Sequence, residues 1–232
     1  MFVALRDLRF ARGRFVLIGS VVALITVLVG FLSGLTGGLA TQNISAVLSI
    51  PADRVVFSAP TTDGADASFS DSTITEQQTT DWDTAAGVTS AEPIGISQTR
   101  AEAGDARIAI AIFGVQPGFN ATAPSQDGRV SLSAPAAKDL AVATGDDLTI
   151  AGTTYTVETI AGDAWYSHTP VVEMTLSDWQ AYSAATGNPD AYATVLAVTG
   201  SPDWETVDTA TSTVSHTVLG SLTALSAFRS EI

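Results

Sequence analysis

Residues Phe15–Leu35 read FVLIGSVVALITVLVGFLSGL, an uninterrupted uncharged stretch near the start of the chain. No Asp, Glu, Lys, Arg or His occurs from Phe15 to Ala52. A bilayer core requires about 20 predominantly apolar residues in helical form, so this stretch is long enough to span a membrane. The alternatives are a buried core helix and the apolar region of a cleaved signal peptide, which usually covers only about 7–15 residues. We therefore predict a retained transmembrane helix over residues 15–36.

The segment before this helix predicts its orientation. Residues 1–14, MFVALRDLRFARGR, contain four arginines and one aspartate, a net charge of +3. Because basic segments beside a span stay in the cytoplasm, we expect a cytoplasmic N-terminus, a cell-membrane location and an extracellular main domain. Phe2, Leu5 and Leu8 also have helical spacing, which favours a segment lying on the inner membrane surface. A plain basic tail that only sets the orientation is the alternative.

The rest of the chain is strongly acidic. Of the 24 acidic residues, 23 follow Ala52, against six basic residues, so this part has a net charge of −17 and the whole chain −14. Such a surface repels phosphates, which argues against a nucleic-acid partner. It suits an exported, solvated domain, although surface solubility alone also explains it. The chain has no cysteine, which excludes disulfides, thiolate metal sites and cysteine nucleophiles.

Helical spacing of apolar residues beyond the span predicts a helical stalk over residues 37–52. After Pro51 the pattern changes and predicts an extracytoplasmic α+β domain over residues 53–202, with a small, partly antiparallel sheet. Two capping boxes, Thr75–Gln78 and Ser177–Gln180, predict helix starts. The expected strands are 54–58, 88–100, 107–115, 171–176 and 194–199, with a hairpin over 147–160 and helices over 76–86, 134–143 and 177–187.

Residues 203–232 are predicted to form a helix with one apolar face that includes Val218, Leu222, Leu225 and Ile232. Charged residues near its end argue against a second span. A domain with amphipathic helices at both ends is typical of an ectodomain inserted between two spans. We therefore expect residues 203–232 to return toward a second span beyond this sequence. The alternative is a single-span protein whose last helix packs on its own domain.

Seven segments follow one another in a recognisable order: MFVALRDLRFARGRF, PADRVVFS, GVTSAEPIGISQTR, IAIAIFGVQPG, VSLSAPAAKDLAVATGDDLTIAGTTYTV, YSHTPVV with Asp178-Trp179-Gln180, and AFRSEI. In this order they resemble the first half of an FtsX/MacB-type (type VII) ABC transporter permease, closest to the heme-exporter and DevC-like permeases of Gram-positive bacteria. The resemblance implies a MacB-like periplasmic core domain, one N-terminal span and three further spans. It also implies a homodimer of permeases that exports a hydrophobic or amphipathic compound such as heme, with ATP hydrolysed by a separate subunit.

The chemistry of the side chains agrees with a transport subunit rather than an enzyme. There is no G-x-x-x-x-G-K-[ST] motif, so we expect ATP on a partner chain and no cofactor in this one. There is no G-x-S-x-G nucleophile elbow, and His168 and His216 are too few and too far apart to suggest a metal cluster. An anchored enzyme would need an acid, base or nucleophile cluster, which the sequence does not display. A single-span anchored binding or adaptor protein stays open.

Two kinds of candidate site residue stand out. Small residues at the outer end of the span allow close approach of another helix, or merely loosen that end; they are Gly30, Ser33, Gly34, Gly37 and Gly38. His168, with Tyr166 and Met174 nearby in sequence, is the candidate ligand for heme iron. The alternative for His168 is a hydrogen-bonded structural residue in a loop. The tryptophans are expected to anchor the core; they are Trp82, Trp165, Trp179 and Trp204.

Overall fold

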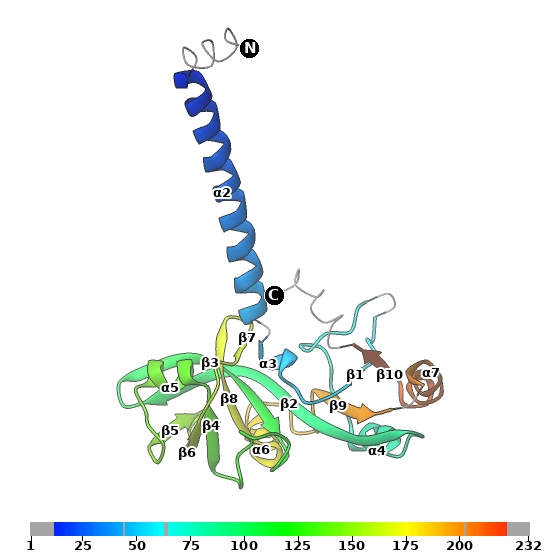
Figure 1. Ribbon diagram of the computed structural model, residues 1–232. Helices are drawn as coiled ribbons and strands as arrows, with labels where there is room; N and C mark the ends of the chain where they lie inside the picture. The colour runs from blue at the N-terminus through cyan, green and yellow to red at the C-terminus, as the bar shows by residue number, and fades with distance from the viewer. Residues whose placement is uncertain (1–11, 44, 63–64, 202, 222–232) are drawn as a thin grey trace. The chain divides into compact units, whose positions relative to one another are not determined.

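The structure is a computed structural model that describes residues 12–43, 45–62, 65–201 and 203–221. The chain divides into two units, residues 1–41 and 42–232, and each is described by itself. Helix α2, Arg12–Asn43, makes up the described part of the first unit and continues into the start of the second (Figure 1). Within it, the 19 residues Val16–Gly34 are long and apolar enough to cross a membrane, and none is buried. This confirms the predicted apolar N-terminal helix.

The second unit contains a four-stranded antiparallel sheet built from both ends of its chain (Figure 1). The strand order is β10-β1-β9-β2. Helix α4 connects β1 with β2, and α7 connects β9 with β10, so the sheet consists of two β-α-β units in the ferredoxin-like arrangement. The elements are β1 (Arg54–Ser58), α4 (Glu76–Asp83), β2 (Val88–Ala103), β9 (Val195–Gly200), α7 (Trp204–Ser215) and β10 (Thr217–Gly220).

Between Gly95 and Thr175 the chain forms a six-stranded barrel, and the second half of β2 is its first strand. Its strands follow one another as β2-β3-β8-β4-β6-β5, and β5 pairs back onto β2 at Ala101↔Ile150, which closes the barrel. The pairs β3–β8 and β4–β6 are parallel and the others antiparallel. The elements are β3 (Ala106–Val115), β4 (Arg129–Leu132), α5 (Ala134–Leu140), β5 (Asp147–Ile150), β6 (Thr153–Ile160), β8 (Thr169–Thr175) and α6 (Leu176–Ala185); a short strand β7 (Trp165–Tyr166) pairs with β8 outside the barrel.

Strand β2 belongs to both parts. Its first half, Val88–Ile94, pairs with β9 in the four-stranded sheet, whereas Gly95–Ala103 pairs with β3 in the barrel. Figure 1 shows β2 as the long strand that runs through both. The sheet and the barrel therefore diverge along one continuous backbone, and the point of divergence is Gly95.

The core follows the two-residue alternation of the strands. In β1, Val56 packs on the face that carries α4 and α7, with Trp82 and Val207. Val55 and Phe57 point to the opposite face. That face is covered in part by α3 (Ser45–Leu48), whose Ala46 and Val47 are buried there. The barrel interior is a third cluster, which includes Ile110, Ile112, Leu148, Val172 and Met174. An α+β domain is confirmed, although the sheet is larger than expected.

The prediction of one continuous helix over 203–232 is wrong where it can be compared. Helix α7 ends at Ser215, His216 adopts a left-handed backbone with φ 53°, and β10 follows. Two tertiary interactions favour the strand: β10 pairs with β1, and the Trp82 Nε1–H donates to Thr217 Oγ1 at 3.0 Å. Leu222, Leu225 and Ile232 lie outside the described residues.

Local capping was predicted correctly at one helix and misplaced at the other. The capping box at α4 is present, with the Thr75 side chain accepting from the Gln78 N–H and the Gln78 side chain accepting from the Thr75 N–H. At α6, however, Thr175 is the cap and accepts from the Asp178 N–H at 3.2 Å. The cap of α6 therefore lies two residues before the predicted cap, Ser177, because β8 runs directly into the helix.

Candidate functional site: an uncharged groove beside β2

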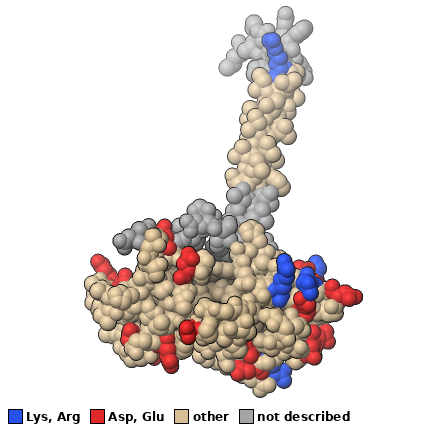
Figure 2. All heavy atoms as spheres, turned by 180° about the vertical axis from the view of Figure 1, so that it is seen from behind, with Lys and Arg blue, Asp and Glu red and all other residues tan. Residues whose placement is uncertain are grey.

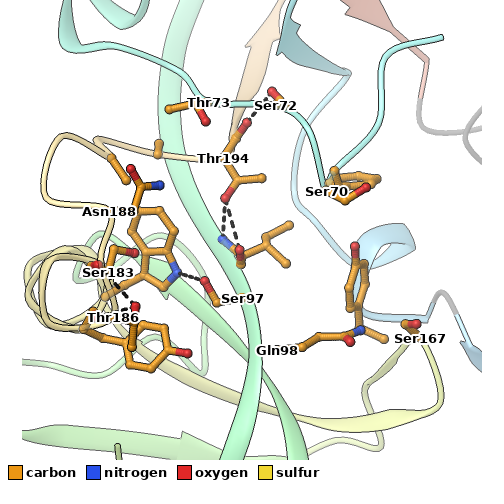
Figure 3. Close-up of a pocket in the computed structure, with 17 residues that line it drawn as sticks. Ser70, Ser72, Thr73, Ser97, Gln98, Ser167, Ser183, Thr186, Asn188 and Thr194 are labelled. Atoms are coloured by element: carbon orange, nitrogen blue, oxygen red, sulfur yellow. Dashed lines mark hydrogen bonds between the residues drawn. The ribbon is translucent and has the colours of Figure 1, made fainter. Parts of the chain in front are cut away.

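The second unit contains a groove of ≈ 760 Å³ beside the middle of β2. It lies where β2 leaves β9 and continues into the barrel. In Figure 3, Ser183, Thr186 and Asn188 lie on one side of β2, and Ser70 and Ser167 lie on the other. The 17 lining residues are Phe69, Ser70, Ser72, Thr73, Ile96, Ser97, Gln98, Tyr166, Ser167, Trp179, Tyr182, Ser183, Thr186, Asn188, Ala191, Ala193 and Thr194.

On one side of the groove, Trp179 of α6 packs directly against β2 and β3. Gly95 of β2 and Gly114 of β3 are cross-strand partners, and the Trp179 side chain lies directly on both. A Cβ atom at Gly95 would be 2.1 Å from the Trp179 ring, and one at Gly114 would be 2.3 Å from its Cβ. The indole Nε1–H donates to Ser97 Oγ at 3.0 Å. Only glycines permit this close approach, so three separate segments of the sequence meet at one tryptophan.

Thr194 holds the fork between β2 and β9. The Ile96 N–H donates to Thr194 Oγ1 at 2.8 Å, and the same hydroxyl donates to the Ile96 carbonyl at 3.2 Å. The Ser72 hydroxyl in turn donates to the Thr194 carbonyl at 2.6 Å (Figure 3). The Thr194 side chain thus provides hydrogen bonds to the N–H and carbonyl of Ile96, which no longer pair with β9. Buried and half-buried polar groups need such partners. This contact keeps the fork open without leaving the strand edge unpaired there.

Aromatic rings form the opposite side. Phe69 meets Tyr166 with ring centres 6.0 Å apart and planes at 83°, and Phe113 meets Tyr166 at 5.6 Å and 80°. Such edge-to-face pairs stabilise the ring positions by about 0.5–1.5 kcal/mol beyond area burial. Burial raises the pKa of Tyr166 to about 12, so its phenol is neutral at physiological pH. Tyr182 of α6 also lines the groove and is half-buried.

The groove contains two amides that no described residue engages. Gln98 on β2 and Asn188 after α6 line it and are exposed, and neither side chain makes a hydrogen bond within the described residues. Other lining hydroxyls serve the fold: Thr186 Oγ1 donates to the Tyr182 carbonyl at 2.9 Å. None of the 17 lining residues is Asp, Glu, Lys, Arg or His. In a chain of net charge −14, this is a locally neutral surface.

The predicted packing residues of the span lie in α2. Gly30 and Gly34 have nothing within 4 Å of where a Cβ would be, and Ser33 is exposed. Gly37 and Gly38 continue the same helix. The surface of α2 bears no Asp or Glu, in contrast to the scattered acidic residues on the second unit (Figure 2). A packing role for this group stays a prediction.

His168 is at the tip of the turn between β7 and β8 and is exposed. Ser167 and His168 both have left-handed backbones, with φ 47° and 65°, as a two-residue hairpin turn requires. The proposed companions of His168 are separated from it: Met174 is fully buried in the barrel core and Tyr166 is largely buried in another cluster. Alternation along β8 explains this for Met174, which points into the barrel.

Gln98 and Asn188 were not singled out in the sequence. Gln98 falls in an alternating strand, where an exposed polar residue is expected, and Asn188 follows a helix end at Gly187, where an Asn is common. Neither pattern indicates a site. Gly95, Gly114 and Trp179 lie in three of the segments whose order carries the resemblance to the permeases, but that order does not indicate a groove.

Comparison with known proteins supports the fold. No protein-family model and no curated protein sequence matches the chain significantly. Among solved structures, the periplasmic region of MacB from Actinobacillus actinomycetemcomitans matches with a TM-score of 0.55 at 8% identity, covering 83% of this chain and 98% of that one. The extracellular domain of the noncanonic ABC-type transporter YknZ from Gram-positive bacteria matches at 12% identity and a TM-score of 0.48, covering 72% and 98%. The chain therefore has the fold of the MacB periplasmic region, as the resemblance implied.

Proposed function

We propose that this chain is a permease subunit of an ABC transporter, anchored by α2 with its N-terminus in the cytoplasm and its second unit outside. The observation that carries the proposal is the shared fold with the MacB periplasmic region over 83% of the chain, joined in sequence to an apolar helix. The basic residues before α2 support the orientation.

In this proposal a separate subunit hydrolyses ATP and two permeases form a homodimer. The face of α2 with Gly30, Ser33 and Gly34 supports close helix packing in the membrane, because small residues let two backbones approach. Movement of the span then acts on the extracellular unit as a rigid lever, since helices transmit such displacements with little internal change.

The proposed cargo is a hydrophobic or amphipathic compound, and heme is the example that the sequence resemblance supplies. His168 is the exposed candidate for heme iron. A heme titration followed by the Soret absorbance tests this part. His168→Asn retains a residue that tolerates the left-handed backbone and is expected to weaken binding at least tenfold. His216→Asn, at the other left-handed histidine, is the matched control and should bind as the unmodified chain does.

A second function is a membrane-anchored extracytoplasmic binding or adaptor protein. The uncharged groove favours it, because a cavity of ≈ 760 Å³ is within the range of about 300–1,000 Å³ typical of small-molecule sites. In that case the groove would be the functional centre and no ATPase would be needed.

The deciding experiment begins with the coding DNA beyond Ile232 and on both flanks. The permease proposal is supported if the reading frame continues into further apolar spans and a neighbouring gene encodes an ATPase with a phosphate-binding loop. The two gene products are then co-expressed, and ATP-dependent export and co-purification are measured. Gly30→Leu with Gly34→Leu should disrupt the assembly, whereas Val27→Leu on the same helix should not. A frame that ends at Ile232 without an ATPase neighbour would leave the binding protein as the better account.

A further inference from the structure

We propose that the groove beside β2 binds a neutral saccharide. The inference does not rest on the proposed export function, because it is argued from the lining residues and tested by binding alone. It goes beyond the shared fold, which assigns no ligand to this groove.

No charged side chain is among the 17 lining residues, although the chain has a net charge of −14. An anionic ligand would meet a repulsive field and no basic partner, and a cationic ligand would meet no carboxylate in the groove to pair with its charge. A buried or half-buried charge without a partner is costly. The groove therefore favours an uncharged ligand.

Gln98 and Asn188 are exposed in the groove and make no side-chain hydrogen bond within the described part of the chain. Each amide offers two donors and one acceptor oxygen. Adjacent hydroxyls of a sugar ring both donate and accept, so an amide is well matched to them.

The groove also has an aromatic surface. Tyr182 and Phe69 are half-buried lining residues, and Trp179 and Tyr166 lie deeper. Flat rings present an apolar face, which suits the C–H face of a pyranose. A ligand with hydroxyls at its rim and apolar faces satisfies both sets of residues at once.

The strand edge argues against an extended peptide in the same place. The Thr194 hydroxyl already engages the N–H and the carbonyl of Ile96. A peptide that adds a strand needs such backbone groups to be unpaired. The groove therefore offers side chains rather than a backbone ladder at this position.

The test uses the full chain in phosphatidylcholine nanodiscs, since alkyl glycoside detergents would compete. Four trisaccharides are titrated by calorimetry: maltotriose and N,N′,N″-triacetylchitotriose, which are neutral, chitosan triose, which is cationic, and trigalacturonate, which is anionic. We expect at least one neutral trisaccharide to bind at least tenfold more tightly than both charged ones, with a change in tryptophan fluorescence through Trp179. Absence of binding by both neutral sugars, or equal binding of neutral and charged sugars, would overturn the proposal.

Variants locate the site. Gln98→Ala and Asn188→Ala are each expected to weaken neutral-sugar binding at least fivefold. Gln126→Ala is the matched control, because Gln126 is an exposed amide outside the lining residues. Both groove residues are exposed, so the variants should keep the circular dichroism and thermal midpoint of the unmodified chain. Unchanged affinity in both folded groove variants would contradict the assignment even if a sugar binds elsewhere.

Discussion

The barrel and the four-stranded sheet are built from the chain in opposite ways. The barrel consists of one continuous stretch from Gly95 to Thr175, and several of its pairs join neighbouring segments, such as β5 with β6. The sheet joins the two ends of the unit, since Val55 of β1 pairs with Gly220 of β10. Closing such long loops costs more chain entropy before any contact forms. The sheet should therefore be the part that opens first.

The largest expected effect comes from breaking the sheet at Trp82. This side chain is fully buried and its Nε1–H donates to Thr217 Oγ1. Trp82→Ala should lower the free energy of unfolding by about 3–5 kcal/mol. All four tryptophans belong to the second unit, so urea unfolding followed by their fluorescence in the detergent-solubilised full chain measures the change.

Hydrogen exchange on the same variant measures the loss of protection separately in the sheet and in the barrel. Amides of β1, β9 and β10 should lose protection more than those of β4, β5 and β6. Trp82→Phe, which keeps most of the ring, should fall between the two. Equal loss of protection in the sheet and the barrel would mean that the two parts unfold together and that the sheet does not open first.

The next largest effect is expected at the junction. Gly95→Ala places a methyl group where the Trp179 ring lies, at 2.1 Å, and overpacking of this kind typically costs about 1–3 kcal/mol. Because α6 is displaced, groove binding should weaken as well. The double variant with Trp179→Ala should be less destabilised than the sum of the two single changes, since the clash is then absent. Strict additivity in urea unfolding would show that no such contact exists.

A smaller effect distinguishes the two candidate caps of α6. Thr175→Ala removes the hydroxyl that accepts from the Asp178 N–H and should cost about 1 kcal/mol. Ser177→Ala changes an exposed residue inside the helix and should stay within about 0.5 kcal/mol of the unmodified chain. Thermal unfolding of both variants makes the comparison. A larger loss of stability in Ser177→Ala than in Thr175→Ala would indicate that Ser177 is the cap.

The smallest effect is a pH dependence at Asp178. Burial raises the pKa of its carboxyl, and the neighbouring Asp127 also raises it, against a hydrogen bond from the Gly128 N–H that lowers it. The folded state therefore binds this proton more tightly than the unfolded state does. The contribution of Asp178 to stability is present at low pH and is lost as pH rises from about 4, the ordinary aspartate value, through the raised pKa.

Asp178→Asn removes this titration but keeps an acceptor for Gly128. Its stability relative to the unmodified chain should rise between about pH 4 and the raised pKa, measured by urea unfolding at several pH values. Asp139→Asn, at an exposed position on α5, controls for the loss of one negative charge. A relative stability of Asp178→Asn that falls over this range would mean that folding lowers the pKa of Asp178 instead of raising it.

Much of the fold was predictable because its signals are local. The apolar helix, the capping box at Thr75 and the hairpin of β5 and β6 depend on residues a few positions apart. The hairpin turn itself lies at Ala151 and Gly152, both with positive φ. β10 was missed because Thr217–Gly220 becomes a strand through β1, which is about 160 residues away in the sequence.

The length and apolar character of α2, the acidic second unit, the absence of cysteine and the α+β class could all be derived from the sequence alone. These depend on composition and on periodicity within one element. Only the tertiary structure decided that β2 is shared by a sheet and a barrel, and that Gly95, Gly114 and Trp179 meet. It also brought Gln98 and Asn188, 90 positions apart in the sequence, into one uncharged groove. No local pattern encodes that groove, because it exists only where two packed parts diverge from a common strand.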